Sequence, residues 1–214
     1  MDKEINAVSS ENDKNMNNDN WRKHQLLNSI SNPASKVNTF STGNNVSLRE
    51  LSTSQLNEKI KDYFSKYYIS SNMKLILYSN HSIDFMENLV SRHFSNLKSQ
   101  NNIDNMYLNL NAYRKEDLNK ILWWKKLSSD QTIDILFYFN INESVYLNSK
   151  PFSYFAYLMS YSGNGSLYSI LDDKKYSTKV DAGIITSKKD FAFFGISISL
   201  TNLGFKISEE VLKI

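Results

Sequence analysis

Two glutamates near the start of the chain have the residue type and the spacing that a metal site needs. Glu4 and Glu11 lie seven residues apart in a segment whose apolar residues recur at helical spacing. On an α-helix this separation places two side chains two turns apart and only about 20° from each other around the axis. Zinc accepts carboxylate oxygen as a ligand. Two acids on the solvent-facing side of a polar helix would have the same spacing, so spacing alone does not assign a function.

Other residues that commonly carry chemistry are sparse or unselective. The three histidines, His24, His81 and His93, are far apart and form no His-x-x-x-His pair, so ordinary surface or core positions are expected for them. The chain has no cysteine, which excludes a thiolate nucleophile, a disulfide framework and a Cys-type zinc site. Its 31 serines are too numerous to single out the nucleophile of a Ser-His-Asp site.

The charge balance indicates no electrostatic partner. The chain carries 25 Lys and Arg against 22 Asp and Glu, a net charge of +3. Residues 123–126, Trp-Trp-Lys-Lys, could stack on nucleic acid, but at this net charge a strand with one buried Trp followed by a solvated turn is expected. We predict no nucleic-acid partner. The apolar runs are too short to span a bilayer, so we predict no membrane partner, with a cytoplasmic location as the default.

The hydrophobic pattern predicts a packed α+β protein. A helix is expected from the start of the chain, followed by a loop at 28–45. Further helices are expected at 52–67, 82–97, 152–159, 166–171 and near 207, and strands at 73–78, 121–124, 133–139, 176–186 and 192–200. The polar stretch Ser99–Asn109 is the expected domain boundary. The 27 Asn and 31 Ser residues are expected to fill solvent-facing positions.

The residues around the two glutamates resemble a known family. Residues 4–15 read Glu-Ile-Asn-Ala-Val-Ser-Ser-Glu-Asn-Asp-Lys-Asn, and the insulinase-like (pitrilysin-type) zinc metallopeptidases read Glu-Val-Asn-Ala-Val-Asp-Ser-Glu-His-Glu-Lys-Asn. Residues 40–44 are similar to the family's Phe-Gly-Thr-Gly-Asn loop, residues 67–73 to its Tyr-Tyr-Ser-Ser-Asn-Leu element, and residues 163–167 to its Gly-Pro-Gly-Ser-Leu turn. Because these matches keep their order over nearly the whole chain, it is identified as a member of this family, similar to its insulin-degrading, single-chain members.

The resemblance implies roles for the two glutamates. Glu11 would be the third zinc-ligand carboxylate, and Glu4 an outer-shell acid that orients the ligands. In the family the other two ligands and the general base come from a His-x-x-Glu-His helix, which occurs nowhere in this sequence. We therefore expect zinc in the full-length protein, whereas this chain alone should neither bind zinc tightly nor cleave peptides.

The resemblance also implies an exosite, a surface that anchors the N-terminus of a peptide substrate away from the zinc. Its expected residues are Tyr161, Gly163, Gly165, Val180, Asp181, Ala182 and Gly183. Relatives read His-Glu-Gly-Pro-Gly-Ser at the first segment and Leu-Val-Gly-Gly at the second. Glycines would let a peptide backbone approach closely, and a strand edge could pair with it. A helix-ending turn beside an ordinary strand is the alternative interpretation.

The family's architecture implies two successive α/β sandwiches. Residues 1–103 would be the C-terminal part of a first, catalytic domain, and residues 104–214 a second, inactive, substrate-binding domain. The chain opens inside a periodic helix, so we expect a fragment of the N-terminal half of a longer metalloendopeptidase. Its expected partners are peptide substrates and the remainder of its own polypeptide. The alternative is a non-catalytic family member that serves as a peptide-binding or scaffold subunit.

Overall fold

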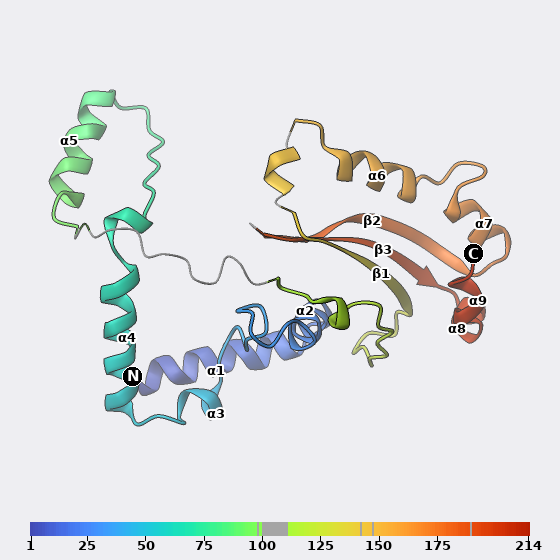
Figure 1. Cartoon of the computed structure of the whole chain (residues 1–214), viewed down its shortest axis with the longest axis horizontal. Helices are drawn as coiled ribbons and strands as arrows, with labels where there is room; N and C mark the ends of the chain where they lie inside the picture. The colour runs from blue at the N-terminus through green and yellow to red at the C-terminus, as the bar shows by residue number, and fades with distance from the viewer. Residues whose placement is uncertain (98, 100–110, 142, 147, 189) are drawn as a thin grey trace. The chain divides into compact units, whose positions relative to one another are not determined.

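The structure, a computed structural model, describes residues 1–97, 99, 111–141, 143–146, 148–188 and 190–214 (Figure 1). Its contacts divide the chain into two compact units. The first unit is Met1–Met16 with Phe40–Tyr107, and the second is Asn17–Thr39 with Leu108–Ile214. The predicted domain boundary lies outside the described residues apart from Ser99, so the division at residue 103 stays a prediction.

Helices make up the described part of the first unit. They are α1 (Asp2–Met16), α3 (Asn45–Leu48), α4 (Thr53–Tyr67), the 3-10 helix η1 (Ser70–Asn72) and α5 (Ile83–Phe94). Helix α4 begins where the sequence predicts, because Ser52 and Gln55 form a capping box. The Ser52 hydroxyl accepts the Gln55 N–H at 3.3 Å, and the Gln55 side chain accepts the Ser52 N–H at 3.0 Å.

The strand predicted at residues 73–78 is wrong. These residues form no strand, and their side chains face solvent, with exposed fractions of 90% for Ile76 and 103% for Tyr78. A strand is stabilised by hydrogen bonds to a neighbouring strand, and the described residues of the first unit include no other strand. Large apolar side chains of α4 and α5 are likewise exposed in large part, as at Phe64 and Leu89.

The second unit is built on a three-stranded antiparallel sheet of order β1–β3–β2 (Figure 1). Its strands are β1 (Thr132–Phe139), β2 (Ser177–Ser187) and β3 (Ala192–Leu200), and its helices are α2 (Asp19–Ser29), α6 (Pro151–Ser160), α7 (Leu167–Asp173), α8 (Asn202–Lys206), α9 (Ser208–Val211), η2 (Lys115–Asp117) and η3 (Glu143–Tyr146). The sheet and the helices together confirm the predicted α+β class. None of the helices that the structure describes is long and apolar enough to cross a membrane.

The three strands of this sheet and the helices at 152–159 and 166–171 confirm the sequence predictions. The strand predicted at 121–124 is wrong, because these residues form no strand and Trp123 is 73% exposed. The helix predicted near Ile207 is confirmed by α9, and the short helix α8 precedes it. Apolar runs therefore became strands only where a neighbouring strand was available to pair with them.

Two apolar cores lie on the two faces of the sheet, because alternate side chains of β3 point to opposite faces. Phe194, Ile196 and Ile198 belong to one core, to which α6 and α7 contribute Phe152, Ala156, Met159 and Leu171. Phe193 belongs to the other core, together with Tyr113 and Phe191. Helices α6 and α7 both contact β2 (Figure 1).

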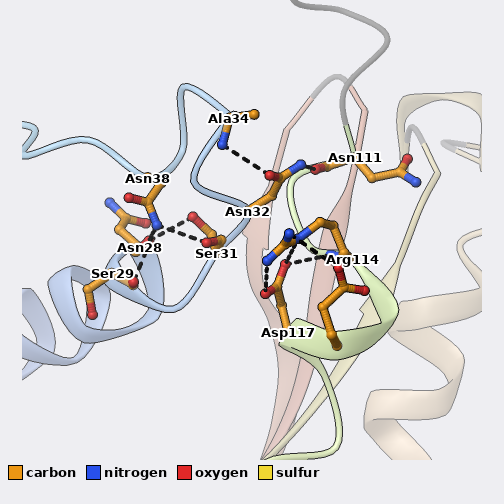
Figure 2. Close-up of polar contacts among 10 residues, drawn as sticks. Asn28, Ser29, Ser31, Asn32, Ala34, Asn38, Asn111, Arg114 and Asp117 are labelled. Atoms are coloured by element: carbon orange, nitrogen blue, oxygen red, sulfur yellow. Dashed lines mark hydrogen bonds and ion pairs between the residues drawn. The ribbon is translucent and has the colours of Figure 1, made fainter.

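A polar network ties the loop after α2 to the segment before β1 (Figure 2). The Asn32 side chain donates to the Asn111 carbonyl at 2.9 Å, and the Asn38 side chain donates to the Ser31 carbonyl at 2.8 Å and to the Asn28 carbonyl at 3.2 Å. Asn28, Ser31 and Asn32 are buried. The expectation that Asn and Ser fill solvent-facing positions is therefore wrong here, because the buried Ser31 and Asn32 side chains donate to backbone carbonyls.

Arg114 and Asp117 form a bidentate ion pair at η2, beside this network (Figure 2). The Arg114 guanidinium donates to both carboxylate oxygens of Asp117 at 2.9 and 2.8 Å, and the Arg114 backbone N–H donates at 2.9 Å. These donors lower the pKa of Asp117 to about 2. A bidentate pair of this kind fixes the orientation of both side chains.

We predict that Asp117→Asn lowers the urea midpoint of the chain at neutral pH. Because the folded-state pKa of Asp117 lies below its ordinary value of about 3.9, the stabilisation is complete above that value and is lost as the pH falls through about 2. The difference in urea midpoint between wild type and variant should therefore become smaller as the pH falls below about 4. Asp130→Asn, at an exposed position outside this ion pair, is the matched control and should leave this pH dependence intact. A difference in urea midpoint that stays constant down to pH 2 would contradict the assignment of this stabilisation to the Asp117 carboxylate.

Candidate functional site

The two glutamates lie on one flank of α1. This helix is continuous from Asp2 to Met16, so Glu4 and Glu11 are about 10 Å apart along its axis and only about 20° apart around it. Both residues are exposed. The structure therefore contains the helix on which the predicted alignment of the two carboxylates depends. The roles of Glu4 and Glu11 stay predictions.

A different flank of α1 is anchored in the first unit. Its buried residues are Ile5, Ser9 and Asn12. The Ser9 hydroxyl accepts the backbone N–H of Asn45 at 3.3 Å, at the start of α3. Because this flank is fixed by packing and hydrogen bonding, α1 presents Glu4 and Glu11 from a defined orientation within the first unit.

The loop at residues 40–44 forms the support under α1. Gly43 is buried and has a φ of +100°, a conformation that favours glycine. A Cβ at this position would lie 3.5 Å from Val8, so the backbone of the loop reaches the helix itself. Asn44 then caps α3 by accepting the Ser47 N–H at 2.9 Å. This loop, one of the segments that carry the family resemblance, therefore has a packing role beside Val8.

The first turn of α1 is held by a charged contact. Arg49 Nη1 lies 2.9 Å from Asp2 Oδ1, and Arg49 Nη2 donates to the Asn6 side chain at 3.4 Å. Both partners of the ion pair are substantially exposed, so this contact orients the helix end more than it stabilises the fold.

The described residues do not build a zinc site by themselves. No group of three or more His, Cys, Asp or Glu side chains is placed to hold a metal ion in the part of the chain that the structure describes. His81 and His93 are exposed, and neither forms a metal-binding group with Glu11. A catalytic zinc needs three protein ligands, so Glu11 supplies one ligand at most.

The first predicted exosite segment is the turn between α6 and α7. The ring of Tyr161 covers Gly163, because its hydroxyl and ring carbons occupy the place where a Cβ of Gly163 would lie. Gly165 has a φ of +80° and open space around it. Ser166 then caps α7 by accepting the Ser169 N–H at 3.0 Å. The turn thus offers backbone at Gly165, whereas Gly163 is covered by its own chain.

The second predicted segment lies on β2, which pairs on one side only among the described residues. Val180 is buried in the sheet core and Ala182 packs against it. Asp181 is exposed and pairs with Lys179 at 2.7 Å, whereas a Cβ on Gly183 would meet nothing within 4 Å. The segment therefore has a structural role through Val180 and Ala182, together with an open backbone at Gly183. Both exosite segments lie in the second unit.

Sequence reasoning missed the residues that fix α2 in the second unit. Asp19 accepts the backbone N–H groups of Leu127 at 2.8 Å and Ser128 at 3.0 Å, and these donors lower the pKa of Asp19. Lys23 Nζ lies 2.9 Å from Asp134 on β1. These backbone partners of Asp19 lie 108 and 109 residues along the chain, so no local sequence pattern could indicate them.

Comparison with known proteins decides the family. A family model described as the peptidase M16 inactive domain matches residues 56–213. The chain belongs to the peptidase M16 family. The insulinase-like resemblance of its sequence is thereby confirmed. The solved structure of pitrilysin overlays on 98% of this M16 chain with a TM-score of 0.72 at 22% identity, which supports the insulinase-like fold.

Two relatives extend this comparison. The M16 chain is 28% identical to insulin-degrading enzyme of Homo sapiens over 214 residues, which is 99% of this chain and 21% of that enzyme. It is 28% identical over 217 residues to mug138 of Schizosaccharomyces pombe, a protein named as a zinc protease, covering 100% of this chain and 22% of that protein. The chain thus spans about a fifth of the length of its relatives.

We predict that the M16 chain on its own has no tight zinc site. Isothermal titration of the 214-residue chain with zinc should give only weak binding, and Glu11→Gln should give the same curve, because one exposed carboxylate is an incomplete ligand set. Glu58→Gln, which removes an exposed carboxylate from α4, is the control for nonspecific binding. A tight single site that Glu11→Gln abolishes would overturn this prediction.

Proposed function

We propose that this chain is part of a zinc-dependent metalloendopeptidase, to which it contributes one zinc ligand and a peptide-binding exosite. Glu11 would ligate the zinc, Glu4 would orient the ligand set, and the remaining ligands would come from the remainder of the polypeptide. When bound, zinc in such an enzyme activates a water molecule for peptide hydrolysis.

One observation carries the proposal. In a chain that belongs to the peptidase M16 family, both glutamates lie on the same exposed flank of one continuous helix that is anchored through its buried residues. A ligand must be held in a fixed orientation while its carboxylate stays free for a metal. The buried Ile5, Ser9 and Asn12 supply the first requirement, and the exposure of Glu11 supplies the second.

The exosite part of the proposal depends on the second unit. Peptide would approach β2 at Gly183 and the α6–α7 turn at Gly165, where backbone is open. Where relatives read His-Glu, this chain has Tyr161 and Ser162. Contact with peptide would therefore rest on backbone pairing and aromatic packing, without a charged side chain from these two positions.

A second candidate is a non-catalytic family member that binds peptide. The match to the inactive domain and the incomplete ligand set among the described residues are compatible with this candidate as well as with the first. The two candidates differ in what Glu11 does. In the first, Glu11 is needed for peptidase activity, and in the second it is dispensable.

The decisive experiment changes Glu11 in the complete protein. If the metalloendopeptidase proposal holds, Glu11→Gln should abolish bound zinc and peptide hydrolysis, and Glu4→Gln should lower activity or zinc affinity by roughly 10- to 100-fold. Glu58→Gln should match wild type. Zinc content by mass spectrometry and cleavage of a fluorogenic peptide are the measurements. Full activity of Glu11→Gln, or a complete sequence without His-x-x-Glu-His, would exclude the catalytic role.

The exosite is tested by peptide binding to the 214-residue chain. Gly183→Leu should weaken binding by about tenfold, or about 1.4 kcal/mol, because a Cβ at this position would meet nothing within 4 Å and the new side chain would extend from there over the open backbone of β2. Acetylation of the peptide N-terminus should also weaken binding to wild type. Asn148→Leu, at an exposed position outside both segments, is the matched control. Equal affinity of all three proteins would refute the exosite.

A further inference from the structure

The turn between α6 and α7 contains the one Asn-Gly pair of the chain, Asn164-Gly165. The family resembled by the sequence has a proline in place of Asn164. We propose that Asn164 is a site of spontaneous deamidation, a covalent modification that converts its amide to a carboxylate. The inference concerns the chemistry of the turn and does not depend on the proposed peptide binding.

The geometry of the turn leaves the two reacting groups accessible. Asn164 is exposed and lies between the end of α6 at Ser160 and the start of α7 at Leu167. Gly165 is itself exposed, and a Cβ built on it would meet nothing within 4 Å. The hydrogen bond that closes the turn runs from Ser166 N–H to the Gly163 carbonyl at 3.1 Å and involves neither reacting group.

The reaction needs no other protein group and no oxidant. The backbone nitrogen of Gly165, on losing its proton, attacks the side-chain carbonyl carbon of Asn164. A carbon–nitrogen bond forms, the bond to the side-chain nitrogen breaks, and ammonia leaves. Water then opens the five-membered succinimide at either carbonyl. The products are aspartate, or isoaspartate in which the chain continues through the side-chain carbon.

Other asparagines lack one or both of these conditions. Asn57 is also exposed, but it lies within α4 and is followed by Glu58. The helix hydrogen-bonds and fixes the following amide, and the side chain of Glu58 hinders approach to its nitrogen. Asn32 is buried, and its side-chain amide donates to the Asn111 carbonyl. Of the 27 asparagines in the sequence, Asn164 alone is followed by a glycine.

Conversion would change the charge of the turn. Residues 151–171 carry no charged side chain, so the product carboxylate would be the first charge in this stretch. The isoaspartate form would also lengthen the backbone between the two glycines that flank Asn164. Both changes fall next to Gly165, where the turn is open.

The test is incubation of the folded 214-residue chain at mildly alkaline pH, followed by digestion after Tyr161 and Leu167. The resulting peptide, residues 162–167, should gain about 1 Da, the difference between an amide and a carboxylic acid. It should resolve into aspartate and isoaspartate forms. A peptide containing Asn57 should stay unchanged over the same period. Asn164→Gln should abolish the shift, because glutamine cyclises far more slowly.

A synthetic peptide with the sequence of residues 162–167 gives the reference rate for an unprotected Asn-Gly pair. The folded chain should convert Asn164 at a similar rate, with circular dichroism used to verify that the chain is folded throughout. Conversion in the synthetic peptide without conversion in the folded chain would overturn the inference, because the turn would then protect Asn164. Equal conversion of Asn57 and Asn164 would overturn it as well.

Discussion

The second unit depends on the burial of β3 between two apolar layers. Phe194 on one face and Phe193 on the other are both buried, as are Ile196 and Ile198. A strand with both faces covered can serve two cores at once, and its neighbours β1 and β2 then have a fixed register against it. The positions of α6 and α7 on β2, and with them the turn at Gly163–Gly165, follow from this arrangement.

The first unit depends on the contact of α1 with the loop at Gly43 and with α3, which is smaller than the burial of β3 but also fixes an orientation. The buried flank of α1 meets the loop at Gly43 and the start of α3, and this contact determines which flank of the helix faces solvent. Polar side chains take part in it, because Ser9 and Asn12 are buried beside Ile5. A helix held in this way can expose two carboxylates without an apolar core of its own. The large exposed side chains of α4 and the 73–78 segment show that the described residues complete no such core.

Buried asparagines help to select one arrangement of the loop after α2 in the second unit. Asn28 and Asn32 are both buried, and they lie within a hydrogen-bonded network that crosses 79 residues of sequence. Buried polar groups of this kind are costly unless every donor and acceptor is paired. The network therefore favours one arrangement of the loop against the Asn111 segment. Composition alone suggested that asparagines occupy solvent-facing positions, because a count of residue types does not distinguish a hydrogen-bonded, buried asparagine from a solvated one.

The sequence by itself determined the local elements and the relation of Glu4 to Glu11. Capping residues, alternation along β1 and β3, and helical spacing are properties of neighbouring residues, so they can be identified without a fold. Tertiary structure decided whether an apolar run became a strand. Residues 133–139 pair with β3, whereas residues 73–78 have no neighbouring strand among the described residues. It also decided which polar residues are buried and that Asp19 binds backbone 108 residues away. Hydrogen-bond partners that are distant in sequence leave no local pattern, which is why only the folded chain shows them.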